Sequence, residues 1–205
     1  AGLLESQKTG VGSNGLPVVQ TTTDGNSVFL EGTQYSKNPQ AEAPRPFLDK
    51  VDIKTGQKQR VFQSAADVHE SVSTILDDNA TRIIIDRQSA TTVPDSYLRE
   101  ANGQTRKLTN NKDYSPEITA APRKLVEVTR PTDGFKFWVR VTLPPNFSTS
   151  APPPPAMFWF YPREYDSQEA YDRGNRAFNK NAFPNVSTRD MDILTKLGYT
   201  VVEPD

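Results

Sequence analysis

Residues 156–161 read Ala-Met-Phe-Trp-Phe-Tyr and form the most apolar run in the chain. Pro155 precedes this run and Pro162 follows it. A continuous apolar stretch of this length between prolines is typical of a strand that is buried on both faces of a sheet. We therefore expect residues 156–161 to lie inside a sheet rather than at its surface.

A helix and a second apolar strand follow this run. Residues 187–197 carry three apolar side chains at helical spacing, and Gly198 stands where a helix would end. Residues 199–203 read Tyr-Thr-Val-Val-Glu and predict another buried strand. A strand, a helix and a strand in this order predict a right-handed crossover in a parallel sheet. The apolar side chains of the helix are those of Met191, Leu194 and Leu197.

A hairpin precedes the apolar run. Residues 125–129 and 135–143 alternate apolar with polar side chains, and Arg-Pro-Thr-Asp-Gly at 130–134 supplies the turn. The loop at 148–155 ends in four consecutive prolines. This loop is either a stiff surface connector or a polyproline ligand for an SH3-type partner.

The first half of the chain consists of short predicted strands in two similar units. Gly56-Gln57 superposes on Gly103-Gln104, which lies 47 residues further on. This offset is close to the roughly 40–50 residues of a four-stranded propeller blade. The units therefore predict β-propeller blades, and a meander of hairpins whose turns share Gly-Gln by chance is the alternative. The second unit comprises predicted strands at 72–76, 81–87, 96–99 and 105–108.

The composition excludes several classes of protein. The 205 residues include 24 basic and 25 acidic side chains, so no nucleic acid is expected as a partner. No run approaches the roughly 20 apolar residues of a membrane span. The absence of cysteine excludes a cysteine nucleophile and thiolate metal sites, and the single histidine disfavours catalytic zinc. The compartment stays open, with an extracytoplasmic one, periplasmic or secreted, favoured.

Three polar features have both a functional and a structural interpretation. His69 could be a general base, but it lacks a serine and an acid that converge on it, so a histidine at a blade edge is expected. Asp77-Asp78-Asn79 could begin a calcium loop, but the residues that follow do not supply the further ligands, and a hairpin turn explains them. A glycosidase-like carboxylate pair could come from Glu164, Asp166 and Glu169.

The order of these features resembles the prolyl oligopeptidase-type serine peptidases. The stretch from Lys107 to Asp205 is similar to the glutamyl endopeptidase-like branch of that family, and Pro46-Phe47-Leu48-Asp49 resembles its late propeller blades. The most distinctive matches are Phe158-Trp159, Tyr161-Pro162, Glu164 and Phe183-Pro184. The resemblance covers nearly the whole chain.

This resemblance implies β-propeller blades (all-β) followed by the N-terminal part of an α/β-hydrolase domain. The implied division is C-terminal propeller blades at 1–110, a connector at 111–124 and an incomplete peptidase domain at 125–205. The chain has no G-x-S-x-G elbow, and in α/β-hydrolases the acid and the histidine follow the serine. The Ser-His-Asp triad is therefore expected beyond Asp205, and this chain alone is expected to be inactive.

The resemblance also implies which residues touch the reaction. Tyr161 matches the tyrosine whose hydroxyl donates to the oxyanion in this family, and the alternative is an aromatic side chain at the rim of a strand. Arg163 and Glu164 either contact a charged substrate group or pair with each other. Pro162 departs from the small residue that is common after the tyrosine in other branches, which leaves the path of this loop in doubt.

The expected partners are peptide substrates and either the remaining C-terminal part of the same enzyme or a second copy of the chain. No cofactor and no metal are expected. A non-catalytic propeller that serves as an interaction module is the alternative function. The two functions differ in whether a G-x-S-x-G motif, an aspartate and a histidine follow in the gene.

Overall fold

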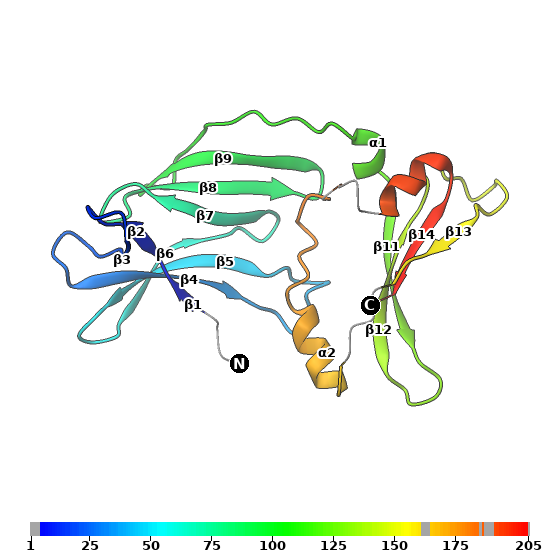
Figure 1. The fold of residues 1–205 in the computed structure, drawn as a ribbon, viewed down its shortest axis with the longest axis horizontal. Coiled ribbons are helices and arrows are strands. Elements are labelled where there is room, and N and C mark those ends of the chain that lie inside the picture. The colour runs from blue at the N-terminus through cyan, green and yellow to red at the C-terminus, as the bar shows by residue number, and fades with distance from the viewer. Residues whose placement is uncertain (1–4, 161–164, 185, 187–190, 205) are drawn as a thin grey trace. The chain divides into compact units, whose positions relative to one another are not determined.

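The computed structural model describes residues 5–160, 165–184, 186 and 191–204 (Figure 1). Its contacts divide the chain into two compact units. Unit 1 comprises Ala1–Lys112 and Arg176–Phe183, and unit 2 comprises Asp113–Asn175 and Pro184–Asp205.

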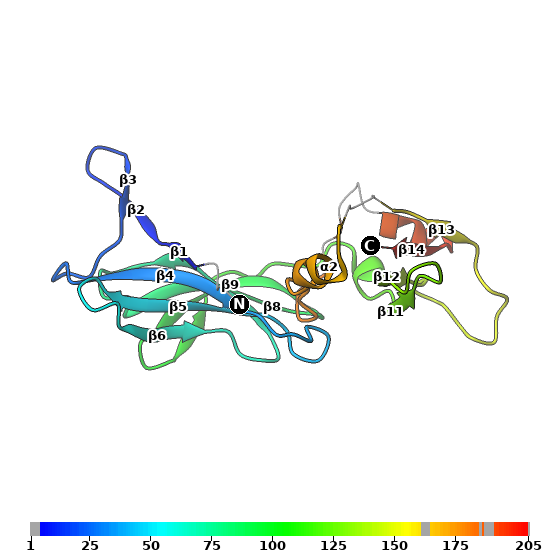
Figure 2. The same cartoon turned by 90° about the horizontal axis from the view of Figure 1, so that it is seen from below.

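The first sheet of unit 1 has the strand order β1-β4-β5-β6, and all neighbouring strands are antiparallel. A glycine with positive φ lies in the turn before β4 (Gly25, φ 68°) and in the turn after β5 (Gly56, φ 70°), where other residues would be strained. A separate hairpin of β2 (Thr9–Val11) and β3 (Pro17–Val19) is inserted after β1 and projects from the sheet (Figure 2). The strands of the sheet are β1 (Glu5–Gln7), β4 (Ser27–Gln34), β5 (Arg45–Asp52) and β6 (Lys58–Gln63).

The second sheet of unit 1 has the order β10-β9-β8-β7 and is also antiparallel. The four segments predicted as strands of the second unit therefore share one sheet, as expected for a blade. Pro94 lies within β9, beside a register shift between Arg87 and Ser89, where a residue without an N–H is tolerated. The strands are β7 (His69–Ile75), β8 (Arg82–Ser89), β9 (Thr92–Glu100) and β10 (Thr105–Lys107).

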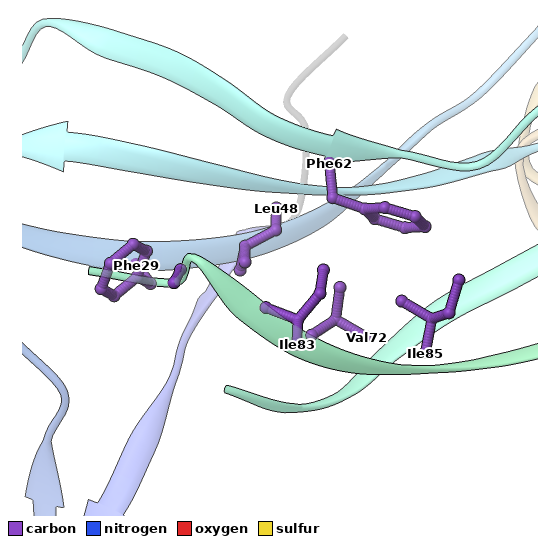
Figure 3. Close-up of a cluster of buried hydrophobic side chains, with 7 residues drawn as sticks. Phe29, Leu48, Phe62, Val72, Ile83 and Ile85 are labelled. Carbon is purple, nitrogen blue, oxygen red and sulfur yellow. The ribbon is translucent and has the colours of Figure 1, made fainter. Parts of the chain in front are cut away.

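The core of unit 1 lies between its two sheets (Figure 3). Each sheet contributes alternate side chains to this core, as strand geometry requires. Packing of one four-stranded sheet on the face of the next is the arrangement of neighbouring propeller blades. The first sheet contributes Phe29, Leu48 and Phe62, and the second contributes Val72, Ile83 and Ile85.

Unit 2 contains a mixed sheet with the order β11-β12-β14-β13. The predicted hairpin is present as β11 and β12, joined by a turn in which Gly134 has φ 74°. β13 and β14 are parallel, which confirms the predicted parallel pairing, and β14 lies between β12 and β13. The elements are α1 (Pro116–Thr119), β11 (Arg123–Thr129), β12 (Lys136–Thr142), β13 (Ala156–Phe158), α2 (Gln168–Asn175), the 3₁₀ helix η1 (Met191–Leu197) and β14 (Thr200–Pro204).

Three expectations need correction. β13 comprises only residues 156–158 and is exposed along its length instead of buried on both faces, because no described helix or strand covers its side chains. The helix before β14 is a 3₁₀ helix over its described residues, Met191–Leu197, and Gly198 follows it with φ 86°. The polar segment after residue 164 contains α2, which the sequence did not predict.

Candidate active site

The ends of β13 and β14 define one edge of the sheet in unit 2. Phe158 is in register with Val202, and the Trp159 amide donates to the Val202 carbonyl at 2.9 Å, which continues the ladder one residue past β13. Parallel strands end at the same edge, and open α/β sheets bind ligands outside the carboxyl ends of their strands. The segment that begins at Phe160 therefore leaves the sheet at the edge where a substrate would bind.

The far end of this segment is anchored on β12 through α2. The Gln168 side chain accepts from the Lys136 amide at 2.8 Å and donates to the Lys136 carbonyl at 3.0 Å. The Tyr171 hydroxyl accepts from the Trp138 amide at 2.7 Å. The Tyr165 ring meets the Tyr171 ring edge-on, with centroids 5.1 Å apart. The two ends of the loop, Phe160 and Tyr165, are thus held by the same sheet.

The three predicted site residues lie in the sequence between Phe160 and Tyr165. Tyr161, Arg163 and Glu164 lie outside the described residues, so their contacts remain predictions. The structure describes the residues on either side of them, Phe160 and Tyr165, near the carboxyl end of β13. Of the three carboxylates considered above for a glycosidase-like pair, Glu164 lies outside the described residues, and Glu169 pairs with Arg173 one turn further along α2.

Large apolar side chains are exposed along β13 and just after it. Phe158 is 62% exposed and Phe160 is 64% exposed, and Met157 and Trp159 are also exposed. No strand pairs with the outer edge of β13 among the residues that the structure describes. Exposed apolar side chains beside an open strand edge are typical of an interaction site.

His69 belongs to unit 1 and opens β7, where it is in register with Gln88. Its Nδ1 atom is buried without a hydrogen-bond partner, and burial lowers the pKa of the imidazole. The structure thus places His69 at the end of a blade strand, as expected.

Asp77 closes the turn between β7 and β8. Its carboxylate accepts from the backbone amides of Asn79, Thr81 and Arg82. Burial raises the pKa of Asp77, but these hydrogen bonds outweigh that effect and hold the pKa below its ordinary value. Within the described parts of the chain, no group of three or more His, Cys, Asp or Glu side chains could hold a metal ion. The contacts of Asp77 are those of a turn residue.

Sequence similarity connects the chain with peptidases. No protein-family profile matches it. It is 24% identical over 208 residues to a probable glutamyl endopeptidase, chloroplastic, of Oryza sativa subsp. japonica, and 27% identical over 154 residues to one of Arabidopsis thaliana. These alignments cover 92% and 68% of the chain but only 22% and 16% of the relatives. The chain thus spans about a fifth of the length of these relatives.

A solved structure is similar to this chain in fold. The crystal structure of Porphyromonas gingivalis dipeptidyl peptidase 4 matches 90% of this chain and 23% of that protein, with a TM-score of 0.51 and 17% identity. The chain resembles the prolyl oligopeptidase-type serine peptidases. Its fold is that of β-propeller blades followed by the N-terminal part of an α/β-hydrolase domain, and its relatives are peptidases.

Sequence reasoning missed the helix that anchors the loop in this peptidase-like sheet. Ser167 caps α2 by accepting from the Ala170 amide at 3.2 Å, and Glu169 places an acid in the first turn. This N-cap pattern was visible in the sequence. Gln168 and Tyr171, spaced i to i+3, form the face that docks on β12. No helix among the described residues is long and apolar enough to cross a membrane.

Proposed function

We propose that this chain is part of a serine peptidase that hydrolyses peptide bonds in oligopeptides. The observation that carries the proposal is the parallel pair of β13 and β14 after two blade-like sheets, in a chain that aligns over 92% of its length with a probable glutamyl endopeptidase. In this proposal the Ser-His-Asp triad follows Asp205, and residues 1–205 alone do not turn over peptides.

The proposed role of Tyr161 is to stabilise the oxyanion. Attack on a peptide carbonyl places negative charge on its oxygen, and a fixed donor aimed at that oxygen stabilises the transition state by about 3–4 kcal/mol. One donor in α/β-hydrolases is the backbone N–H after the nucleophile, and the other comes from the loop after the third strand. β13 is the third strand of unit 2 along the chain, and the loop that leaves it contains Tyr161.

Arg163 and Glu164 are the proposed contacts for a charged group of the substrate. They follow Tyr161 on the same loop, so a substrate held by the oxyanion donor would have its flanking residues beside them. Opposite charges on neighbouring positions suit a peptide that carries both a carboxylate and an ammonium or guanidinium group. Replacement of either residue is expected to change the substrate preference more than the turnover.

The proposed role of the blades is selection of the substrate. We assign residues 1–110 to the C-terminal blades of a propeller, 111–124 to a connector and 125–205 to the start of the peptidase domain. A propeller that caps an active site admits only small or flexible peptides. In this proposal the blades therefore select the substrate and take no part in the chemistry.

The apolar side chains beside the open edge of β13 support a further element of the proposal. Phe158, Trp159 and Phe160 are expected to be covered either by the remaining part of the enzyme or by a second copy of the chain. Sedimentation of purified residues 1–205 tests this: association, or co-purification of a second polypeptide, is expected. A monodisperse monomer at high concentration contradicts it.

The experiment that tests the function compares two preparations. The longer polypeptide is expected to cleave oligopeptides, and purified residues 1–205 are not. The gene beyond Asp205 should encode G-x-S-x-G, then an aspartate, then a histidine. If these residues are absent, the alternative of a non-catalytic propeller module remains. Peptide turnover by residues 1–205 alone would show that the triad does not lie beyond Asp205.

A further inference from the structure

The chain crosses between the two units three times. It passes from unit 1 to unit 2 at Lys112–Asp113, returns at Asn175–Arg176, and leaves again at Phe183–Pro184. Residues 176–183, which we call the strap, therefore belong to unit 1 by their contacts, although α2 precedes them and η1 follows them. The strap lies beside the blade strands of unit 1 in both views (Figures 1 and 2).

Asn181 binds the strap to the connection between the two blades. Its side-chain amide donates to the Ala66 carbonyl at 2.9 Å, and it also approaches the Val68 carbonyl at 3.4 Å. Ala66 and Val68 lie in the loop that joins β6 of the first blade to β7 of the second. The Asn181 backbone amide donates to the Asn179 side-chain oxygen at 3.0 Å, which holds the strap in a turn.

Three further hydrogen bonds attach the strap to both blades. The Asn179 side chain donates to the Pro44 carbonyl at 3.1 Å, and Lys180 Nζ donates to the Ala41 carbonyl at 2.6 Å. Both carbonyls belong to the loop between β4 and β5 of the first blade. The Phe183 amide donates to the Gln88 side chain of the second blade at 2.8 Å. All of these acceptors lie at one end of the blade strands.

The chemistry of these contacts suits reversible docking. The strap is held by side-chain amides, an ammonium group and one backbone amide, and none of its residues is fully buried. Its Phe178 side chain is 38% exposed, so part of the ring stays in contact with water when the strap is docked. Hydrogen bonds between polar groups exchange readily with hydrogen bonds to water, so their net contribution to stability is modest. No strap residue belongs to a strand of unit 1, so detachment of the strap would break no strand pairing in either sheet.

We propose that the strap is a releasable latch that limits the motion of unit 2 relative to unit 1. When the strap is docked, three chain crossings join the units. When it detaches, the linker at Lys112–Asp113 is the one remaining crossing within residues 5–204.

The absence of cysteine makes a direct test possible. Lys54→Cys in unit 1 and Thr132→Cys in unit 2 allow one spin label to be attached to an exposed turn of each unit. Dilution with an excess of unlabelled chain ensures that the measured distances are those within one molecule. Pulsed electron resonance then gives the distance distribution in the whole 205-residue chain. The distribution is expected to broaden in Asn179→Ala/Asn181→Ala and to stay unchanged in the matched control Asn110→Ala, because Asn110 lies on the surface outside the strap.

Amide hydrogen exchange of residues 176–183 shows whether the strap has detached. Faster exchange there together with a broader distance distribution supports the latch. Faster exchange with an unchanged distance distribution overturns the latch. Unchanged exchange also overturns it, because the two asparagines would then not hold the strap. If the double variant folds poorly, Gln88→Ala is the second variant. It removes the acceptor of the Phe183 amide from outside the strap and is likewise expected to speed exchange in the strap and to broaden the distance distribution. Peptidase activity is not needed for any of these readouts.

Discussion

The Tyr171 hydroxyl accepts a hydrogen bond from the Trp138 backbone amide at 2.7 Å. β14 ends at Pro204, which is in register with Val139, so Trp138 is the next residue of β12 toward its start. Helix α2 therefore supplies hydrogen-bonding groups to residues of β12 that lie beyond its described pairing with β14, and Gln168 does the same for the amide and carbonyl of Lys136. This arrangement fixes the far end of the loop that contains Tyr161.

Replacement of Tyr171 tests this arrangement. Tyr171 is 2% exposed, and Tyr171→Phe leaves the Trp138 amide without its acceptor, so the variant should lose about 1–3 kcal/mol of unfolding free energy. Both tryptophans, Trp138 and Trp159, lie in unit 2, so tryptophan fluorescence during denaturation reports this unit. Tyr165→Phe is the matched control and should change stability by less than about 0.5 kcal/mol. Equal stability of the two variants would contradict the account.

The core between the blades predicts a second effect on stability. Ile85 is fully buried in the second sheet, in the cluster that joins it to the first, so Ile85→Ala should cost about 2–5 kcal/mol and Ile85→Val about 0.5–1.5 kcal/mol. Circular dichroism should detect the loss while tryptophan fluorescence of unit 2 changes little. Val11→Ala, at an 80% exposed position, is the control. A loss below 1 kcal/mol for Ile85→Ala would argue against packed blades.

The single histidine predicts a pH dependence. Burial lowers the pKa of His69 below about 6.5, so the folded state binds its proton less readily than the unfolded state does. Stability should therefore be greatest above pH 6.5 and should fall as the pH drops below that value toward the folded pKa. The measurement is the unfolding free energy between pH 5 and 7.5, and His69→Gln should remove the slope. The same slope in both proteins would mean that another group is responsible.

The proposed oxyanion donor predicts a kinetic effect in the full-length enzyme. Tyr161→Phe removes one hydroxyl and should lower kcat about 10²–10³-fold with little change in substrate affinity, because the donor acts only as charge develops. Tyr165→Phe, on the same loop, should remain within about threefold of wild type. If Tyr161→Phe also remains within threefold, Tyr161 only packs against the strand.

Local turn chemistry made much of the fold predictable. Gly56 and Gly103 both have positive φ, and both stand in the last hairpin of a sheet, which explains why their superposition revealed the repeat. The match is nevertheless not exact in register. The first hairpin has six residues between Val51 and Lys58, and the second has five between Arg99 and Thr105. A sequence offset detects the repeat but not a one-residue change in the turn.

Contacts between distant segments were less predictable. The apolar pattern of residues 156–161 indicated a strand in a parallel pair, and the structure has one at residues 156–158 beside β14. The pattern did not indicate its exposure, because a pattern does not show which elements cover the faces of a strand. The strap was missed since Asn179 and Asn181 bind carbonyl groups more than 100 residues away, and any exposed carbonyl could serve as their acceptor. The predicted site residues, Tyr161, Arg163 and Glu164, lie outside the described residues and remain predictions.

Labelling with a fluorophosphonate tests the central claim most directly, because this reagent modifies an activated serine covalently. The full-length protein and purified residues 1–205 are treated in parallel, and mass spectrometry locates the label. The account predicts modification of one serine beyond Asp205 in the full-length protein and none in residues 1–205. A full-length protein that stays unlabelled, or a labelled serine within residues 1–205, would contradict it.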